Sequence, residues 1–223
     1  IVSREAWLAE REVLLAREKA ATRELDALAK ARQALPWVAV EADYTFQSEI
    51  GPVSFESLFA GRSQLLIYHF MFGPDWSEPC DGCRAWAIAL NGTLDQIYKH
   101  DANLVVVSSA PIEDIRCVKA ARGWSFTWPS AQGNRFNQDF GMSTDRDRAS
   151  QQVGSETVFY ERGETGGINA FVHTDEGIFH TYACFNRGIQ QMNGAFGYVD
   201  LLPYGGNSVS YTHLTLPTMQ VVG

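Results

Sequence analysis

The chain has 223 residues, of which 45% are hydrophobic and 20% charged, and its formal net charge is −8. These proportions are typical of a globular protein and argue against a disordered or fibrous chain. An acidic surface repels phosphate groups, which argues against nucleic acid and anionic membranes as partners, and no apolar run approaches the roughly 20 residues of a membrane span.

The cysteine content and the first residues predict a compartment. Four cysteines are too few for the disulfide framework of a small secreted protein. Residues 1–7 carry charges and lack the apolar core of a signal peptide. We therefore expect a cytoplasmic protein.

Residues 4–33 contain no Gly or Pro and are predicted to form one long amphipathic helix, which Ser3 caps and Pro36 ends. Its apolar residues recur every seven positions, at Trp7, Leu14, Ala21, Leu28 and Leu35. This stripe fits pairing with a partner or with a second copy, which would give a homodimer, and it also fits packing across its own domain. We treat residues 1–35 as an N-terminal helical extension.

The composition changes after Pro36 to aromatic residues, β-branched residues and turn signals. The predicted strands, in chain order, cover residues 38–40, 44–46, 64–72, 103–108, 168–174 and 178–183. The predicted helical segments cover residues 54–59, 80–99, 111–122 and 187–198, and residues 141–156 are expected to be a polar, irregular surface insertion.

This order of elements predicts the fold class. Two buried strands alternate with helices early in the chain, and a hairpin around Asp175-Glu176-Gly177 comes late. An α/β, thioredoxin-like sandwich has this order, here with the long N-terminal helix in front of it. We expect this domain to span residues 36–206.

Cys80 and Cys83 form a Cys-x-x-Cys motif between a buried strand and the start of a helix. A thiol in the first helical turn faces unpaired backbone N–H groups and the positive end of the helix dipole, which stabilise its thiolate. The motif therefore predicts thiol–disulfide exchange with protein or small-molecule disulfides and dithiols. Cys80 is the expected nucleophile and Cys83 the resolving thiol.

Two other interpretations of the pair stay open, a zinc site and a chemically idle pair. Zinc needs two further ligands, but the sequence has no second Cys-x-x-Cys and no closely spaced His pair, only the isolated Cys117 and Cys184. Gly-rich phosphate loops are absent as well. We expect no bound metal and no bound cofactor.

Three segments carry a resemblance to a known family: Phe55–Trp76, the cysteine pair and Phe179–Tyr182. They closely resemble the bacterial thioredoxin-like family catalogued as domain of unknown function 899, whose members are described as predicted dithiol–disulfide oxidoreductases. The resemblance extends from about Ser3 to Pro203. It implies a thioredoxin-like fold and a dithiol–disulfide oxidoreductase activity.

The sequence departs from the family between its cysteines, where Asp81-Gly82 replaces a Pro followed by a small residue. The carboxylates of Asp81, Glu78 and Asp75 oppose the helix dipole. We therefore predict that Cys80 is less acidic than the nucleophile of a strong oxidant, and that the protein is a reductant or a slow enzyme.

A second departure concerns the segment expected to face the pair. Thioredoxins place a cis-proline there, whereas this chain has Thr165-Gly166-Gly167-Ile168. Glycine allows close approach of a substrate backbone, but it does not supply the proline clamp.

Other polar and reactive residues are assigned structural roles. His69 and His180 are expected to be hydrogen-bonded core histidines, and Cys117 and Cys184 small buried residues. Trp76 fits either the rim of the site or packing over its loop. Four carboxylates are expected to be solvated: Asp139, Asp145, Asp147 and Glu156.

Two alternative functions remain. A thiol-dependent peroxidase is one, because Ser77 lies three residues before Cys80, at the offset where peroxiredoxins carry Thr or Ser. A non-catalytic thioredoxin-like binding module is the other.

The last residues form a separate case. Val209–Thr218 resemble one reading frame of a transposase-type sequencing adapter, so residues 207–223 are expected to be a non-native tail. The alternative is a short native β-tail, because Val, Thr and Tyr favour strands.

Overall fold

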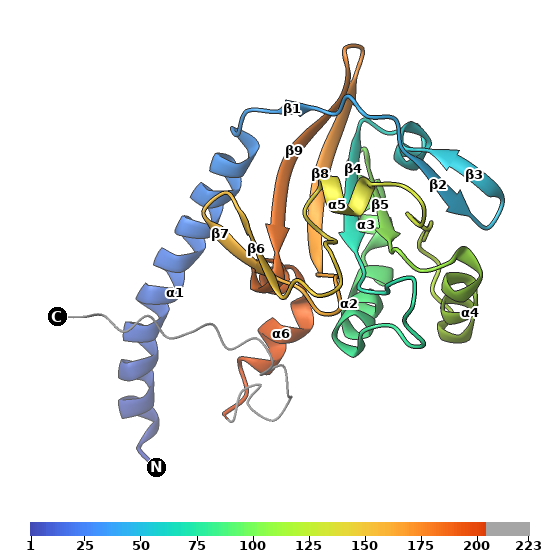
Figure 1. Cartoon of the computed structure of the whole chain (residues 1–223). Coiled ribbons are helices and arrows are strands. Elements are labelled where there is room, and N and C mark those ends of the chain that lie inside the picture. Colours follow the sequence, from blue (N-terminus) through green and yellow to red (C-terminus); the bar gives the residue numbers. More distant parts are fainter. Residues whose placement is uncertain (204–223) are drawn as a thin grey trace. The chain divides into compact units, whose positions relative to one another are not determined.

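The computed structural model of the chain describes residues 1–203, so the predicted non-native tail over residues 207–223 lies outside the described residues. The chain divides into two compact units, Ile1–Val38 and Ala39–Gly223, which are described separately (Figure 1). Among the described residues, no helix combines the length and the apolar character needed to cross a membrane.

The first unit consists mainly of helix α1, Arg4–Gln33, as the sequence predicts. The Ser3 hydroxyl accepts a hydrogen bond from the backbone N–H of Ala6 at 3.2 Å and so caps the first turn. None of the residues of α1 is buried, and its apolar stripe is exposed. The two roles considered for this stripe stay predictions.

The second unit is built on one five-stranded sheet with the order β1-β9-β8-β4-β5 (Figure 1). The strands are β1 (Val38–Ala39), β4 (Gln64–His69), β5 (Ala102–Val107), β8 (Gly167–Thr174) and β9 (Gly177–Phe185). β4 pairs with β5 in parallel and with β8 in antiparallel. The predicted buried strands and the late hairpin β8–β9 are confirmed.

Each face of the sheet carries its own hydrophobic core, because the side chains of β4 and β5 alternate between the two faces. On one face Tyr68 and Val106 pack against helices α2 (Asp81–Asn91), α3 (Leu94–Tyr98) and α4 (Ile112–Arg122).

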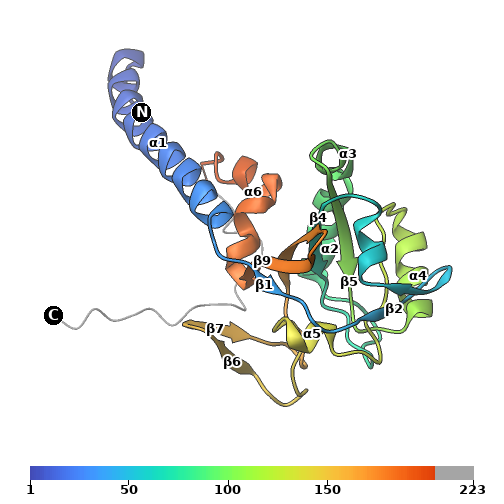
Figure 2. The same ribbon diagram turned by 90° about the horizontal axis from the view of Figure 1, so that it is seen from above.

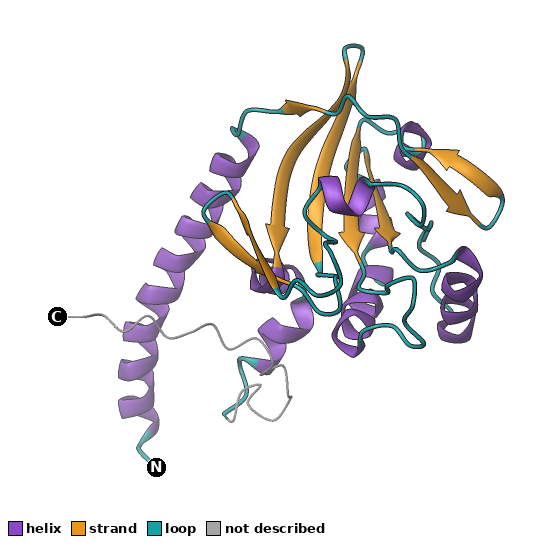
Figure 3. Ribbon diagram, in the orientation of Figure 1, coloured by secondary structure: helices purple, strands orange, loops and turns teal. Residues whose placement is uncertain are grey.

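On the other face Leu65, Ile67 and Val105 pack against aromatic residues that include Phe46 and Phe136. The covering elements here are the hairpin β2–β3 (Thr45–Ser48 and Gly51–Ser54), the short helix η1 (Glu56–Phe59) and α5 (Phe136–Asp139) (Figure 3). The result is a layered α/β arrangement in which β4 is buried on both sides.

The structure corrects three element predictions. The helix expected over residues 80–99 is two helices, because Gly92 and Thr93 favour helix weakly and Thr93 Oγ1 bonds the carbonyl of Leu90 at 2.9 Å. The helix expected over 187–198 is likewise two short helices, η2 (Asn186–Met192) and α6 (Gly194–Val199).

The third correction concerns residues 141–156, which are not irregular throughout. They include strand β6 (Ser150–Val153), which pairs with β7 (Glu156–Phe159) (Figure 2). This pair packs on the end of β9 through Val158 and Phe185, and Met142 is fully buried there.

Candidate functional site

The two cysteines of the motif lie where the sequence predicts, at the start of the first helix after β4. Cys80 is the N-cap residue of α2, and its carbonyl accepts the N–H of Arg84 at 3.1 Å. Its own N–H bonds the carbonyl of Met71 at 3.1 Å, which ties it to the loop that follows β4. Cys80 is partly exposed, whereas Cys83 in the first turn is buried, and both are free thiols.

Hydrogen bonds at the helix start make Cys80 acidic. The Cys83 thiol donates to Cys80 Sγ, and the backbone N–H groups of Cys83 and Gly82 also point to it. These bonds outweigh burial and lower the pKa of Cys80 from 9.0 to about 7. About half of the Cys80 side chains are therefore thiolates at neutral pH.

Cys83 has the opposite character. Its hydrogen bond to Cys80 and its burial raise its pKa well above 9.0, so it keeps its proton while Cys80 is a thiolate. The two thiols thus differ in both access and acidity. An accessible thiolate beside a buried thiol is an arrangement that can attack a disulfide and then close on itself.

Arg84 neutralises two of the carboxylates that were expected to oppose the thiolate. Its guanidinium lies 2.7 Å from Glu78 and 3.1 Å from Asp81, and it also bonds the carbonyl of Pro79 at 3.1 Å. Arg84 therefore both balances the charge next to Cys80 and fixes the loop in front of it.

The carboxylate that does act on Cys80 comes from a distant part of the chain. Asp75 is paired with Arg146 at 2.9 Å, while Glu161 raises the pKa of Cys80. The prediction that Cys80 is less acidic than the nucleophile of a strong oxidant agrees with the structure, since its pKa of about 7 is well above that of such a nucleophile. The predicted source, the three sequence neighbours, is wrong because arginines neutralise them.

Replacing Arg84 with glutamine is expected to raise the pKa of Cys80 by about 0.5 to 1 unit, because it leaves Glu78 and Asp81 unpaired beside the thiolate. The pH dependence of Cys80 alkylation by iodoacetamide measures this change. The matched control is Arg116→Gln, which breaks a similar pair with Glu113 on α4. An unchanged alkylation profile in the Arg84 variant would contradict the role given to this residue.

Tyr68 places a buried hydroxyl beside Cys83. Its side chain is 1% exposed, and the hydroxyl makes no well-aligned hydrogen bond. The Cys83 thiol faces it, and this contact lowers the pKa of Cys83 while burial keeps that of Tyr68 well above 10.0. A buried hydroxyl without a proper partner costs roughly 1–3 kcal/mol. This cost is offset when Cys83 becomes a thiolate, because the thiolate accepts a hydrogen bond from the Tyr68 hydroxyl.

Replacing Tyr68 with phenylalanine is expected to slow the attack of Cys83 on a mixed disulfide about tenfold, because the forming thiolate loses a donor. The free energy of unfolding stays the same or rises, since an unsatisfied hydroxyl is removed. Stopped-flow release of the second thiol measures the rate, and urea unfolding measures stability. A loss of stability without a kinetic effect would show that the hydroxyl is merely structural.

The segment expected to face the cysteine pair does so. A Cβ atom built on Gly166 would lie 3.8 Å from Cys83 Sγ, an ordinary contact distance. A Cβ on Gly167 would lie 2.7 Å from the carbonyl oxygen of Cys184, so glycine is required there. Among residues 1–203 no peptide bond is cis. Open glycine backbone therefore stands beside Cys83 where thioredoxins carry proline.

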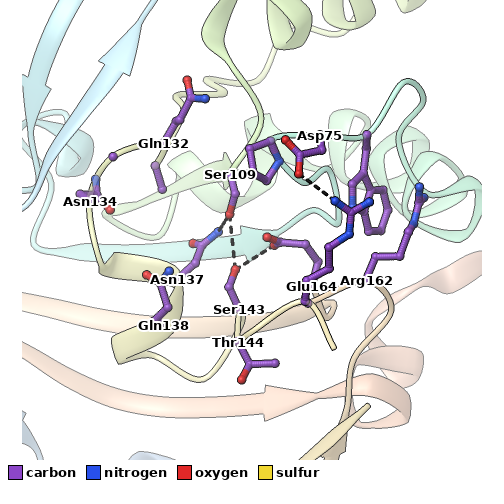
Figure 4. Close-up of a pocket in the computed structure, with 16 residues that line it drawn as sticks. Asp75, Ser109, Gln132, Asn134, Asn137, Gln138, Ser143, Thr144, Arg162 and Glu164 are labelled. Atoms are coloured by element: carbon purple, nitrogen blue, oxygen red, sulfur yellow. Dashed lines mark hydrogen bonds and ion pairs between the residues drawn. The ribbon is translucent and has the colours of Figure 1, made fainter. Parts of the chain in front are cut away.

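Trp76 packs over its loop, one of the two roles considered for it, and the role at the rim of the site stays a prediction. It is 5% exposed and packs in the core that contains Cys83, with the Arg162 guanidinium 3.8 Å from its ring centre. It also forms part of the wall of a cavity of about 210 Å³ (Figure 4). The innermost carboxylate of this cavity is Glu164, which the sequence interpretation missed.

Seven polar side chains form a continuous hydrogen-bonded chain through the core, in the order His180, Asn169, His69, Asn137, Ser109, Ser143 and Glu164. His69 is bonded through both ring nitrogens, and burial lowers its pKa to about 3. His180 is partly buried, and its pKa is lowered as well. Both are hydrogen-bonded core histidines, as predicted.

The remaining assignments are mixed. Cys184 is buried as predicted, but Cys117 is exposed, because it lies on the outer face of α4. Of the four carboxylates expected to be solvated, Asp145, Asp147 and Glu156 are exposed. The Asp139 side chain is 31% exposed and accepts a hydrogen bond from the Tyr44 hydroxyl at 2.9 Å. Within residues 1–203 no three metal-ligating side chains are gathered at one place.

Residues 1–220 match the sequence profile of a family described as "Bacterial protein of unknown function (DUF899)". The chain belongs to this family. No curated protein matches it. Its structure resembles three solved structures of peroxiredoxin Q from Xanthomonas campestris, each with a TM-score of 0.51 and 14–16% identity. In each case the similarity covers 73% of this chain and 92% of the other.

The likeness to these structures concerns the fold. Together with the sheet order, it confirms the predicted thioredoxin-like α/β architecture with a long N-terminal helix. In this fold Cys80 and Cys83 lie at the start of α2, after the loop that follows β4. The cavity beside Trp76 is lined by that loop, by Ser109 after β5, by residues in and around α5 and by two segments before β8.

Proposed function

We propose that this member of the DUF899 family is a thiol–disulfide oxidoreductase in which Cys80 is the nucleophile and Cys83 the resolving thiol. The observation that carries the proposal is the difference between the two thiols at the start of α2. Cys80 is accessible with a pKa of about 7, whereas Cys83 is buried and protonated.

In the first step the Cys80 thiolate attacks one sulfur of a substrate disulfide. A mixed disulfide forms, and the other substrate sulfur leaves as a thiolate that takes a proton from water. The backbone N–H groups of Gly82 and Cys83 stabilise the Cys80 thiolate before the attack. Their hydrogen bonds to Cys80 Sγ weaken when the mixed disulfide forms, because the sulfur then carries no charge.

In the second step Cys83 releases its proton to water, and its thiolate attacks Cys80 Sγ. The Cys80–Cys83 disulfide forms as the mixed disulfide breaks, and the second substrate sulfur leaves as a thiolate that takes a proton from water. Two electrons have then passed from the pair to the substrate. The Met71 N–H, 3.4 Å from Cys83 Sγ, and the Tyr68 hydroxyl stabilise the Cys83 thiolate during this step. An external dithiol then reduces the pair, so no bound cofactor takes part.

The substrate is a protein or small-molecule disulfide, and a reducing compartment such as the cytoplasm suits the acidity of Cys80. A strong oxidant needs a much more acidic nucleophile, whose reduced form is stabilised. The pKa of about 7 therefore favours reduction of substrates over oxidation.

The experiment is to trap the mixed disulfide. In Cys83→Ser, treatment with dithiobis(nitrobenzoate) is expected to leave a stable adduct at Cys80, located by peptide mass spectrometry. Cys117 is exposed and also reacts with this reagent, so Cys83→Ser/Cys117→Ser is the matched control and should keep the adduct at Cys80. An adduct at Cys117 without one at Cys80 would overturn the proposal. Rapid peroxide consumption with slow disulfide reduction would instead identify a peroxidase.

A further inference from the structure

Most of the residues that line the cavity beside Trp76 carry polar side chains (Figure 4). Its volume of about 210 Å³ is below the roughly 300–1,000 Å³ of sites that bind drug-sized ligands, so it suits a group of a few atoms. Gln132, Asn134 and Gln138 lie at its outer part, and Ser143 and Glu164 lie close together in it (Figure 4). The cavity therefore offers hydrogen-bonding groups around a single buried carboxylate.

A tight turn holds Glu164 in this position. Glu161 and Glu164 exchange backbone hydrogen bonds of 2.8 and 3.0 Å, and the two residues between them, Arg162 and Gly163, have positive φ angles of 47° and 84°. A Cβ atom on Gly163 would lie 2.8 Å from the carbonyl oxygen of Thr144. A positive φ at a non-glycine residue such as Arg162 stores about 1 kcal/mol or more of strain, which is typical of functional sites.

Glu164 has hydrogen-bond donors but no cationic partner. Its residue exposure is 6%, and the Ser143 hydroxyl donates to Oε2 at 2.9 Å. Burial nevertheless raises its pKa to about 7. Among residues 1–203 no cation forms an ion pair with it, because Arg146 is paired with Asp75 and Arg162 lies over Trp76.

The hydrogen-bonded chain behind Glu164 has one direction. His180 donates to Asn169, Asn169 to His69, and every later member donates toward the carboxylate. All these donors are neutral, since the pKa of His69 is about 3 and that of His180 is also lowered. The network thus orients and polarises the Glu164 carboxylate but supplies no positive charge to neutralise it. Among residues 1–203 no cation is paired with Glu164, although Arg146 and Arg162 also line the cavity.

The same turn reaches the cysteine pair. Glu161 is close enough to Cys80 to raise its pKa. Gly166, two residues after Glu164, lies beside Cys83, since a Cβ atom built on it would be 3.8 Å from Cys83 Sγ. Trp76 belongs both to the wall of the cavity and to the core around Cys83. The cavity and the core around Cys83 therefore share one residue, Trp76.

We propose that this cavity is a substrate subsite that binds the ammonium group of a small amine-bearing disulfide at Glu164. This inference rests on the proposed function, whose substrate class it specifies. The ammonium group pairs with the Glu164 carboxylate. The Ser143 hydroxyl and the amide oxygens of the outer Gln and Asn side chains accept hydrogen bonds from its remaining N–H groups. The disulfide then extends past Trp76 toward Cys80.

The proposal has a pH dependence that separates Glu164 from the nucleophile. An aliphatic ammonium stays charged throughout, whereas Glu164 ionises around pH 7. The ratio of kcat/KM for a cationic disulfide to that for a neutral one therefore rises between pH 6 and pH 8. Ionisation of Cys80 cancels in this ratio because both substrates meet the same thiolate. The other charged groups that line the cavity are Asp75, Arg146 and Arg162.

The test compares cystamine, the neutral hydroxyethyl disulfide and the anionic dithiodiglycolate as substrates. We expect cystamine to be preferred over the neutral disulfide about tenfold at pH 8, and Glu164→Gln to reduce this preference to about twofold or less. The net charge of −8 attracts any cation. Glu156→Gln, which removes an exposed carboxylate, is therefore the matched control and should keep the preference.

A binding measurement separates this inference from the proposed function. In Cys80→Ser/Cys83→Ser, calorimetry is expected to show that cystamine binds at least tenfold more tightly than hydroxyethyl disulfide, and that Glu164→Gln removes the difference. Binding of cystamine without its reduction by the unmodified protein would leave the subsite intact and overturn the oxidoreductase proposal. Equal binding of cystamine and the neutral disulfide would overturn the subsite, whatever the activity.

Discussion

Replacing Cys80 with serine is expected to lower the rate of disulfide reduction at least about a thousandfold, because a serine hydroxyl is not ionised near neutral pH and cannot form a mixed disulfide. The measurement is a single turnover of the pre-reduced protein with dithiobis(nitrobenzoate), followed by the release of thionitrobenzoate. A Cys117→Ser background removes the one other exposed thiol among residues 1–203.

Cys83→Ser provides the complementary result. Its Cys80 still attacks, so one equivalent of thionitrobenzoate is released quickly, but the second is not released because the resolving thiol is absent. A Cys80→Ser variant that keeps the rate of the parent protein would contradict the assignment of the nucleophile. Release of two equivalents by Cys83→Ser would contradict the assignment of the resolving thiol.

Glu164→Gln is expected to stabilise the protein at pH 8 by up to about 3 kcal/mol. The pKa of Glu164 rises from 4.5 to about 7 on folding, so the folded state keeps a proton that the unfolded state has released. Wild-type stability therefore decreases as the pH rises from 4.5 to 7 and stays low above pH 7. Glutamine does not ionise, so the stability of the Glu164→Gln variant does not show this decrease.

Urea unfolding of the wild type and the variant at pH 5 and pH 8 measures this effect. The two proteins should differ much less at pH 5, where the folded wild type is still protonated at Glu164. Glu156→Gln, at an exposed position, should show no comparable change with pH. A difference between wild type and Glu164→Gln that is the same at both pH values would show that Glu164 keeps its ordinary pKa.

A carboxylate that destabilises the fold at neutral pH is characteristic of a functional site, since packing alone gives no reason to bury an unpaired charge. Glu164 lies in a cavity and not in a closed core, and its turn contains the strained Arg162. These features are consistent with a site that becomes favourable only when a cationic ligand is present.

Much of the fold could be predicted from local sequence patterns. Apolar runs identify β4 and β5, the first of them bounded by Gly61 and Gly73. The spacing of apolar residues identifies α1 and the region of α2 and α3, and Pro111 marks the start of α4. The position of Cys80 and Cys83 at a strand-to-helix junction follows from the same patterns. These features depend on residues that are near one another in the chain.

The features that were not predicted depend on contacts between distant residues. Glu161 acts on Cys80 across about 80 positions of sequence, and Glu164 meets Ser143 only because β6 and β7 fold back between them. Sequence neighbours suggested Asp81 as an opposing charge, but its pairing with Arg84 becomes evident only in the structure. The pair Arg162-Gly163 was the one local signal, because a hairpin turn with two positive φ angles favours glycine.

The reduction potential of the Cys80–Cys83 pair tests the central claim most directly. The protein is equilibrated with glutathione or dithiothreitol buffers, and the fraction of alkylated Cys80 and Cys83 is measured by mass spectrometry. A pKa of about 7 for Cys80 predicts a reversible two-electron transition with a midpoint in the reducing range, roughly −200 to −270 mV. Failure of the two thiols to form a disulfide with each other, or a midpoint near about −120 mV, would contradict the account.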